Sequence, residues 1–424
     1  MADSNPTLVV HHASQLLTLA GGPQRGHQLG NLGIIDRGAV AIRGDRILAV
    51  GQSDDLLKAY PDTPRLDANG RVVMPGFVDP HTHLVWAGDR ADEFTLRLQG
   101  KSYMEILAMG GGILSTVRAT RAATLEELIL QTRQRARYAF THGTTTLEVK
   151  TGYGLTLDSE LHQLKAILVL DDEGPLELVP TFLGAHAVPP EYKDNPDHYV
   201  DLLCEEMLPG VFDWWQAEAP HRPLPFVDVF CEQGAFDLAQ TRRILSAAQE
   251  LGFPLKVHAD EFENLGGTAL AAELGAASAD HLVKTSPGDI QALAKGNTVA
   301  VSLPGTPFGL NDSEYTPAKV IIEADGLLAL ATDTNPGTSW CESMQFMLAL
   351  ACRKMDLKPA QAIAAATINA AAALQLEDMI GSIEPGKQAD LLILDVNNYQ
   401  HLGYRFGTNL VSQVIKQGRI YPVT

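Results

Sequence analysis

The chain contains the stretch Pro75-Gly76-Phe77-Val78-Asp79-Pro80-His81-Thr82-His83, a short apolar run that ends in two histidines. Residues i and i+2 of a strand point to the same face, so His81 and His83 can aim their rings at one point. Two convergent imidazoles are natural ligands for Zn²⁺ or Fe. The stretch therefore predicts a metal site at the carboxyl end of a strand.

The apolar part of this stretch, Gly76–Val78, is the first of eight short runs that we predict as strands. Predicted helices lie between most of them, and one opens with the capping box Thr124-x-x-Glu127. Strands that alternate with helices predict an α/β protein, and eight such units predict a (β/α)8 TIM barrel. The other strands are Thr144–Val149, Leu176–Phe182, Phe226–Phe230, Leu255–Val257, Ala277–Ala279, Thr298–Ser302 and Leu327–Ala331. The helices are Leu125–Thr141, Ser159–Leu170, Leu238–Leu251, Gly267–Leu274, Ser339–Met355 and Pro359–Leu374.

Both ends of the chain contain short β-like runs broken by turns, without a helix-rich pattern. Each end is too small to bury a core alone. We therefore expect residues 1–75 and 376–424 to pair into one small composite β-sandwich domain, with the TIM barrel over residues 76–375. The runs are Thr7–Val10, Gly38–Arg43, Ile47–Val50, Ala389–Leu394 and Val411–Lys416.

The composition excludes several classes of partner. The formal net charge is −19, so the chain should repel nucleic acid and anionic membranes. An anionic small-molecule substrate would then need its own cation inside the pocket. Four scattered cysteines, no secretory signal and no apolar run of about 18 residues predict a cytoplasmic protein.

The active site of a TIM barrel lies at the carboxyl ends of its strands. Polar side chains should therefore gather just after the predicted strands, and they do. They are His81, His83, Lys150, Tyr153, His186, Glu232, His258, Glu261, His281 and Asp333.

Two of these residues complete the predicted metal site. His258 ends the fifth strand and Asp333 follows the eighth. Three histidines and one carboxylate leave a coordination position for water, which is typical of a catalytic site. Glu261 stands one turn after His258, within reach of the protons of such a water. The competing interpretations are a core histidine for His258, a helix cap for Asp333 and a surface carboxylate for Glu261.

The order of these motifs resembles the amidohydrolase superfamily: H-x-H after the first strand, His after the fifth, His281 after the sixth and Asp after the eighth. Many members bind two metals through a carboxylated Lys that ends the fourth strand. Here that strand ends Val229-Phe230-Cys231-Glu232, without a Lys. The chain therefore resembles the branch that binds one metal, Zn or Fe.

Within that branch the chain resembles the imidazolonepropionase family over nearly the whole barrel. Several of the matching stretches are not shared with general deaminases. They are Asp79–His83, Trp86–Arg90, Gly110–Ile113, Glu148–Gly154, Leu183–His186, His258–Glu261 and Asp333–Thr338.

The resemblance implies a substrate, 4-imidazolone-5-propanoate, and a product, N-formimidoyl-L-glutamate, in histidine degradation. It also implies a homodimer. Arg90 suits this substrate, because a guanidinium can bind its propanoate through two hydrogen bonds. The expected metal ligands are His81, His83, His258 and Asp333, and the expected catalytic residues are Glu261, His281 and Asp333. The expected substrate contacts are Arg90, Tyr153, His186, Glu261, Asn335, Gly337 and Thr338.

His281 would stabilise the oxyanion, while Glu261 and Asp333 would handle protons. Which carboxylate acts first is left open by the sequence. The alternatives are another one-metal ring hydrolase or a deaminase acting on cytosine or guanine, for which Arg90 has no evident use. A catalytically inactive assembly protein commonly loses metal ligands, and none is lost here.

Overall fold

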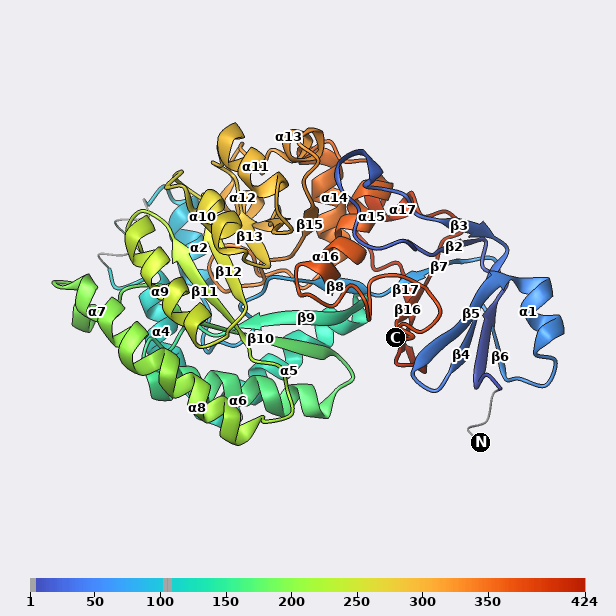
Figure 1. Ribbon diagram of the computed structural model, residues 1–424, viewed down its shortest axis with the longest axis horizontal. Helices are drawn as coiled ribbons and strands as arrows, with labels where there is room; N and C mark the ends of the chain where they lie inside the picture. Colours follow the sequence, from blue (N-terminus) through green and yellow to red (C-terminus); the bar gives the residue numbers. More distant parts are fainter. Residues whose placement is uncertain (1–4, 102–104, 106–108, 424) are drawn as a thin grey trace.

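A computed structural model describes residues 5–101, 105 and 109–423. Figure 1 shows a barrel and, beside it, a smaller domain of strands near both chain ends. Residues 1–4 and 424, which belong to the expected β-domain, lie outside the described residues. Among the helices of the described residues, none is both long enough and apolar enough to cross a membrane.

All eight predicted barrel strands are confirmed. They form one parallel sheet in which each strand pairs with the next along the chain. A parallel bridge between Thr82 and Thr334 brings the last strand back beside the first. The fold is therefore the predicted TIM-like barrel. Its strands are β8 (Phe77–Asp79), β9 (Thr144–Lys150), β10 (Glu177–Ala185), β11 (Phe226–Cys231), β12 (Leu255–Ala259), β13 (Ser278–His281), β14 (Val299–Ser302) and β15 (Leu328–Leu330).

Helices cover the outside of the barrel and bury its apolar surface. The capping box before α5 is confirmed: Thr124 and Glu127 each accept a backbone N–H of the other. The longer helices are α2 (Ala91–Leu98), α4 (Ile113–Ala122), α5 (Leu125–Thr141), α6 (Leu157–Glu173), α8 (Leu208–Glu218), α9 (Leu238–Glu250), α10 (Gly267–Leu274), α11 (Pro287–Ala294) and α14 (Met344–Lys354). The shorter ones include α7 (Pro196–Leu202), α12 (Gly305–Leu310), α13 (Ala318–Glu323) and α17 (His401–Tyr404).

Two helix predictions need correction. The run Pro359–Leu374 forms two helices, α15 (Pro359–Ala365) and α16 (Ile368–Ala372). The carbonyl of Ala366 accepts the backbone N–H of Val78 in β8, so it is not available to continue the helix. The helix predicted to start at Ser339 starts at Met344, because the Ser343 side chain caps it.

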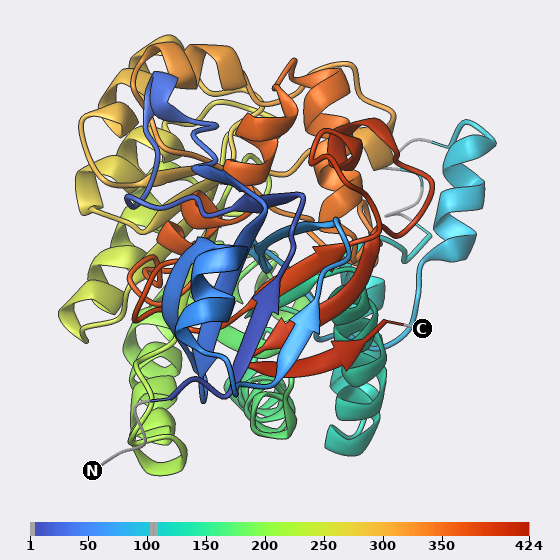
Figure 2. The ribbon, with the colours of Figure 1, turned by 90° about the vertical axis from the view of Figure 1, so that its right-hand side faces the viewer.

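The smaller domain contains two sheets. The six-stranded sheet has the order β18-β17-β16-β7-β2-β3, so it joins strands from both ends of the chain. Figure 2 shows these early and late strands side by side. The four-stranded sheet has the order β5-β4-β1-β6 and carries α1 (Ser53–Ala59). The strands are β1 (Leu8–His11), β2 (Gln15–Leu17), β3 (Ile34–Asp36), β4 (Gly38–Arg43), β5 (Arg46–Gln52), β6 (Arg65–Asp67), β7 (Val72–Pro75), β16 (Leu391–Leu394), β17 (Val411–Lys416) and β18 (Arg419–Pro422).

A shared core holds the two sheets together. Val40 and Ile42 of the smaller sheet belong to the same buried cluster as Leu391 and Ile393 of the larger one. The expected composite β-domain is therefore present. Strand β7 pairs with β16 and leads directly into β8, so this domain anchors the strand that carries His81 and His83.

The expected division of the chain at residues 75 and 376 stays a prediction. One N-terminal segment lies against the barrel rather than within the β-domain. The backbone N–H of Gly26 donates to the Gly326 carbonyl at 3.1 Å, and that of Gln24 donates to Asn369 Oδ1 at 2.7 Å.

Candidate active site

The four predicted metal ligands converge at the mouth of the barrel. The Nε2 atoms of His83 and His258 are 3.2 Å apart. Asp333 Oδ1 lies 3.5 Å from Nε2 of both His81 and His83. Two nitrogens bound tetrahedrally to one Zn²⁺ would be about 3.3 Å apart, given metal–nitrogen bonds of about 2.05 Å. The spacing of the donor atoms therefore fits a single metal ion.

Several of these donor atoms have no other partner. Among the described residues, His81 Nε2 and Asp333 Oδ1 are buried without a hydrogen bond. Such an atom costs about 1–3 kcal/mol when left unpaired, and a metal ion would satisfy both. Burial holds the pKa of His81 and His83 well below the usual range, so both rings are neutral and can donate a lone pair.

Asp333 is buried, and its backbone holds the carboxyl group beside the histidines. Burial raises the pKa of its carboxyl to about 6, although the hydrogen bond from Thr306 opposes the shift. Its backbone has a φ of +51°, and its N–H donates to the carbonyl of His81 at 3.1 Å. This link between the last and first strands fixes the carboxylate beside the H-x-H pair.

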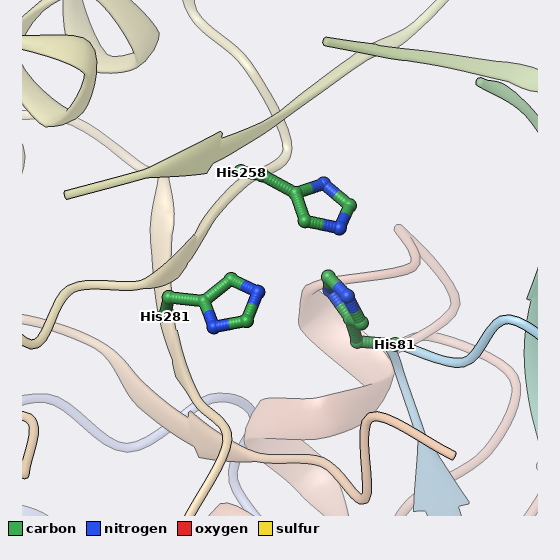
Figure 3. Close-up of side chains that lie close together, drawn as sticks. All are labelled: His81, His258 and His281. Atoms are coloured by element: carbon green, nitrogen blue, oxygen red, sulfur yellow. The ribbon is translucent and has the colours of Figure 1, made fainter. Parts of the chain in front are cut away.

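His281 belongs to the same cluster. Figure 3 shows the rings of His81, His258 and His281 facing a common centre, and their donor atoms lie within 4.8 Å of one another. A second triplet of donors consists of His81, His83 and Asp333. His281 Nε2 also lies 3.6 Å from Glu261 Oε2, so this ring is next to the predicted proton carrier.

Glu261 is largely buried, with its side chain 10% exposed. Burial raises the pKa of its carboxyl well above the usual range, and the charges of Asp333 and Glu232 add to the effect. Glu232 also holds the loop that carries Glu261, because its carboxylate accepts the backbone N–H of Phe262 at 2.9 Å and of Glu263 at 3.2 Å. A carboxyl with a raised pKa can give and take protons near neutral pH.

A network of buried charges lies next to the predicted metal ligands. Of its residues, only Lys150 is among the polar side chains predicted at the strand ends. Lys150 Nζ lies 2.6 Å from Glu148 Oε1, 2.8 Å from Asp228 Oδ2 and 3.8 Å from Asp280 Oδ2. Lys256 Nζ donates to the Pro80 carbonyl at 2.8 Å, just before the H-x-H motif. We call these five charged residues the interior network: Glu148, Lys150, Asp228, Lys256 and Asp280, all almost fully buried.

The interior network orients two of the predicted metal ligands. Asp280 Oδ2 lies 2.6 Å from His81 Nδ1, and Asp228 Oδ2 lies 2.9 Å from His258 Nδ1. A carboxylate on one ring nitrogen directs the other nitrogen at the metal and makes it more basic. Burial alone would raise the pKa of Asp228, but His258 and Lys150 lower it well below the usual range.

A sequence signal for this network did exist. Charged residues stand inside otherwise apolar strands, and Lys256 precedes His258 by two residues, on the same face. Asp228 stands alone in an apolar strand in the same way. Such residues point into the barrel, where a charge requires a partner.

Arg90 lies at the start of α2, beside the loop that follows Asp333. Its Nε donates to Glu93 Oε2 at 2.8 Å, and no described residue pairs with its terminal nitrogens Nη1 and Nη2. A Cβ atom on Gly337 would lie 2.4 Å from Arg90 Nη1, so the guanidinium lies directly against this glycine. Two guanidinium nitrogens are therefore free to bind a carboxylate.

Tyr153 and His186 lie against the metal donors. The ring of His186 stacks on that of His83, with centroids 4.8 Å apart and an angle of 17°. Gly152 has a φ of +111° and accepts a hydrogen bond through its carbonyl from His186 Nδ1. Burial lowers the pKa of His186 to about 3, which keeps the ring neutral. Glu160, absent from the predicted set, holds this loop by accepting the N–H of Gly152 at 2.8 Å.

The predicted contacts Asn335, Gly337 and Thr338 form one loop after Asp333. Asn335 Oδ1 accepts the N–H groups of Gly337 and Thr338, both at 2.8 Å, and its Nδ2 donates to the Asp333 carbonyl at 2.7 Å. The side chain of Asn335 therefore shapes the loop that faces Arg90. Direct substrate contacts by these three residues stay predictions.

Solved structures share the fold. One is an adenosine deaminase from Xanthomonas campestris with bound zinc. It superposes with a TM-score of 0.71 over 99% of this chain and 93% of its own, at 19% identity. A likeness at this level of identity establishes the architecture alone.

Sequence relatives identify the family. Residues 72–421 match the model of the amidohydrolase family, and residues 38–62 match that of the bacterial imidazolonepropionase-like composite domain. An imidazolonepropionase of Herpetosiphon aurantiacus is 53% identical over 96% of this chain and 97% of its own length. One of Symbiobacterium thermophilum is 51% identical over 97% and 96%. The chain therefore belongs to the amidohydrolase family and, within it, to the imidazolonepropionases.

Proposed function

We propose that this hydrolase opens the cyclic amide of 4-imidazolone-5-propanoate to give N-formimidoyl-L-glutamate, a step of histidine degradation. The observation that carries the proposal is the position of Arg90. It presents two free guanidinium nitrogens against Gly337, four residues after the metal donor Asp333. The name imidazolonepropionase, shared by full-length relatives at 45–53% identity, supports the same reaction.

One metal ion, Zn or Fe, is proposed to be held by His81, His83, His258 and Asp333. Imidazole and carboxylate donors suit either metal. When bound, such a metal supplies Lewis acidity, which polarises a carbonyl and acidifies water.

Different residues of the chain would carry out the separate steps of the reaction. The water oxygen bonds to the lactam carbonyl carbon, the C–N bond breaks and the leaving ring nitrogen takes a proton. Glu261, a largely buried acid with a raised pKa, is placed to carry that proton. His281 faces Glu261 and would stabilise the oxyanion, and Asp333 is the second proton acceptor.

Substrate binding relies on the propanoate end of the molecule, away from the lactam carbonyl. Arg90 would bind the propanoate with both terminal nitrogens, supplying the local cation that a chain of net charge −19 requires. Tyr153 and His186 would contact the ring, and the loop of Asn335, Gly337 and Thr338 would close beside it. Burial keeps the pKa of Tyr153 above its usual value, so its hydroxyl stays protonated and can donate a hydrogen bond.

The test combines metal analysis of the purified protein with turnover of freshly prepared imidazolonepropionate, followed by loss of its ultraviolet absorbance. We expect one metal per chain and rapid turnover. Metal without turnover would overturn the proposed substrate and leave the fold intact. Release of ammonia from cytosine or guanine would instead identify a deaminase.

Three further properties belong to the proposal. The protein would act in the cytoplasm, which the four free cysteines support, because a reducing compartment keeps thiols unpaired. Its partner would be a small anionic substrate, since the acidic charge disfavours nucleic acid and anionic membranes. A homodimer is expected from the resemblance, and sedimentation analysis would test it.

A further inference from the structure

The composite β-domain carries another cluster of metal-ligating side chains, formed by His11, His12 and Asp67. One ligand atom from each residue lies within 4.8 Å of the others. The cluster stands where β1 and β6 run side by side, in the domain next to the barrel (Figure 1). None of its residues belongs to the active site.

The backbone brings the three side chains together. His11 on β1 stands opposite Asp67 on β6 in the parallel ladder. His12 would point to the other face in a regular strand, because successive residues alternate. Its left-handed backbone, with a φ of +55°, instead brings its ring to 4.3 Å from that of His11, measured between centroids.

Hydrogen bonds hold this backbone in place. The N–H of His12 donates to Ser53 Oγ at 2.9 Å, and its carbonyl accepts the N–H of Gly70 at 2.9 Å. The carbonyl of His11 accepts the N–H of Ala68 at 2.8 Å. The ligand atoms are therefore gathered before any ion binds.

The hydrogen bonds of the cluster leave one nitrogen atom, His11 Nδ1, without a partner among the described residues. Asp67 Oδ2 lies 3.1 Å from His12 Nδ1, and Asp67 Oδ1 accepts the N–H of Asn69 at 2.8 Å. His11 is only 7% exposed, and among the described residues its Nδ1 has no hydrogen-bond partner. The rings of His11 and His12 stand at 81°, so they are not stacked on each other. His11 thus has a buried nitrogen without a partner and stands in a cluster with two further residues of ligand type, which points to a cation.

We propose that His11, His12 and Asp67 form a second metal site, which takes a divalent transition ion such as Zn²⁺ with water completing its coordination. Two imidazoles and one carboxylate suit zinc, whereas Ca²⁺ and Mg²⁺ prefer oxygen ligands alone. The ion would link β1 to β6, the edge strand of the four-stranded sheet. Its role is structural, because binding to the folded state alone stabilises the fold.

The test uses the full chain with its active-site metal already loaded. Dialysis against Zn²⁺ followed by metal analysis should give one more zinc per chain in the wild type than in Asp67→Asn or His12→Asn. Asparagine tolerates the left-handed backbone at position 12. Zinc should raise the melting temperature of the wild type and leave that of both variants unchanged.

Histidine 221, which is exposed and outside the cluster, provides the control. His221→Ala should keep the additional zinc. Turnover should be the same in all four proteins, which shows that the variants are folded and separates this site from the proposed activity. The proposal is overturned if the wild type takes up no additional zinc, or if both cluster variants keep it. If a variant does not fold, anomalous scattering at the zinc edge from a wild-type crystal decides whether zinc lies at His11.

Discussion

The interior network and the surroundings of Arg90 differ in how they use charged residues. In the interior network, Lys150 and Lys256 are completely buried, and carboxylates lie within 2.8 Å of Lys150 Nζ and 3.9 Å of Lys256 Nζ. Arg90, in contrast, is partly exposed, and its two terminal nitrogens have no partner among the described residues. This difference supports the proposal that the interior network positions the metal and that Arg90 binds the substrate.

The largest effect is expected from Lys150→Met, which tests whether the interior network supports the metal donors. It would remove the buried cation that lies within 3.8 Å of the carboxylates of Glu148, Asp228 and Asp280, at a cost of about 3–5 kcal/mol. Thermal unfolding and metal analysis should show a large loss of both stability and metal. The control Lys165→Met removes an exposed pair with Glu218 and should cost less than about 1 kcal/mol. Equal effects in the two variants would contradict a special role for the interior.

Glu261→Gln is expected to affect chemistry alone. Removing a proton carrier costs about 10²–10⁴-fold in rate. The value of kcat should fall by that factor while metal content stays at the wild-type level. Loss of metal from this variant would place Glu261 among the metal ligands. The residues that hold the metal would then no longer be distinct from those that act on the substrate.

Arg90→Lys tests the proposed role of Arg90 in binding the carboxylate of the substrate. Lysine keeps the charge but cannot bind a carboxylate through two parallel hydrogen bonds. We expect kcat/KM to fall by roughly tenfold to a hundredfold, mostly through KM, with metal content and melting temperature unchanged. Arg133→Lys, in an exposed pair with Glu173, is the matched control and should show wild-type kinetics. A change in metal content would link Arg90 to the interior.

The smallest effect concerns pH. The pKa of Asp333 is raised to about 6 in the metal-free fold, so the carboxyl is protonated below that pH and cannot serve as a ligand. Metal affinity should therefore fall by about tenfold per pH unit below 6 because of this group. The stability of the metal-free protein should depend on pH in the opposite direction. The stabilisation that protonated Asp333 contributes is present below its unfolded pKa and is lost as pH rises through about 6. Metal titrations between pH 5 and 7 check the first effect, and a flat affinity would contradict it.

Much of the architecture could be predicted because it depends on local patterns. The alternation of strands and helices and the H-x-H motif after β8 are readable residue by residue. The break between α15 and α16 could not be read in this way, since it depends on Ala366 bonding to Val78, far away in the chain. The ion pairs of the interior network could not be read for a similar reason. The partners of Lys150 come from β9, β11 and β13, and only the closed barrel brings them together.

The pairing of β7 with β16 also constrains the order of folding. It joins Pro75 to Leu391, so most of the barrel sequence lies between the two partners. During synthesis β7 leaves the ribosome long before β16, and the six-stranded sheet can be completed only after the whole barrel sequence has emerged. Contacts between residues so distant in sequence form slowly, because a long loop must close first. The β-domain is thus begun first and finished last, and until then the edge of β7 stays exposed to mispairing.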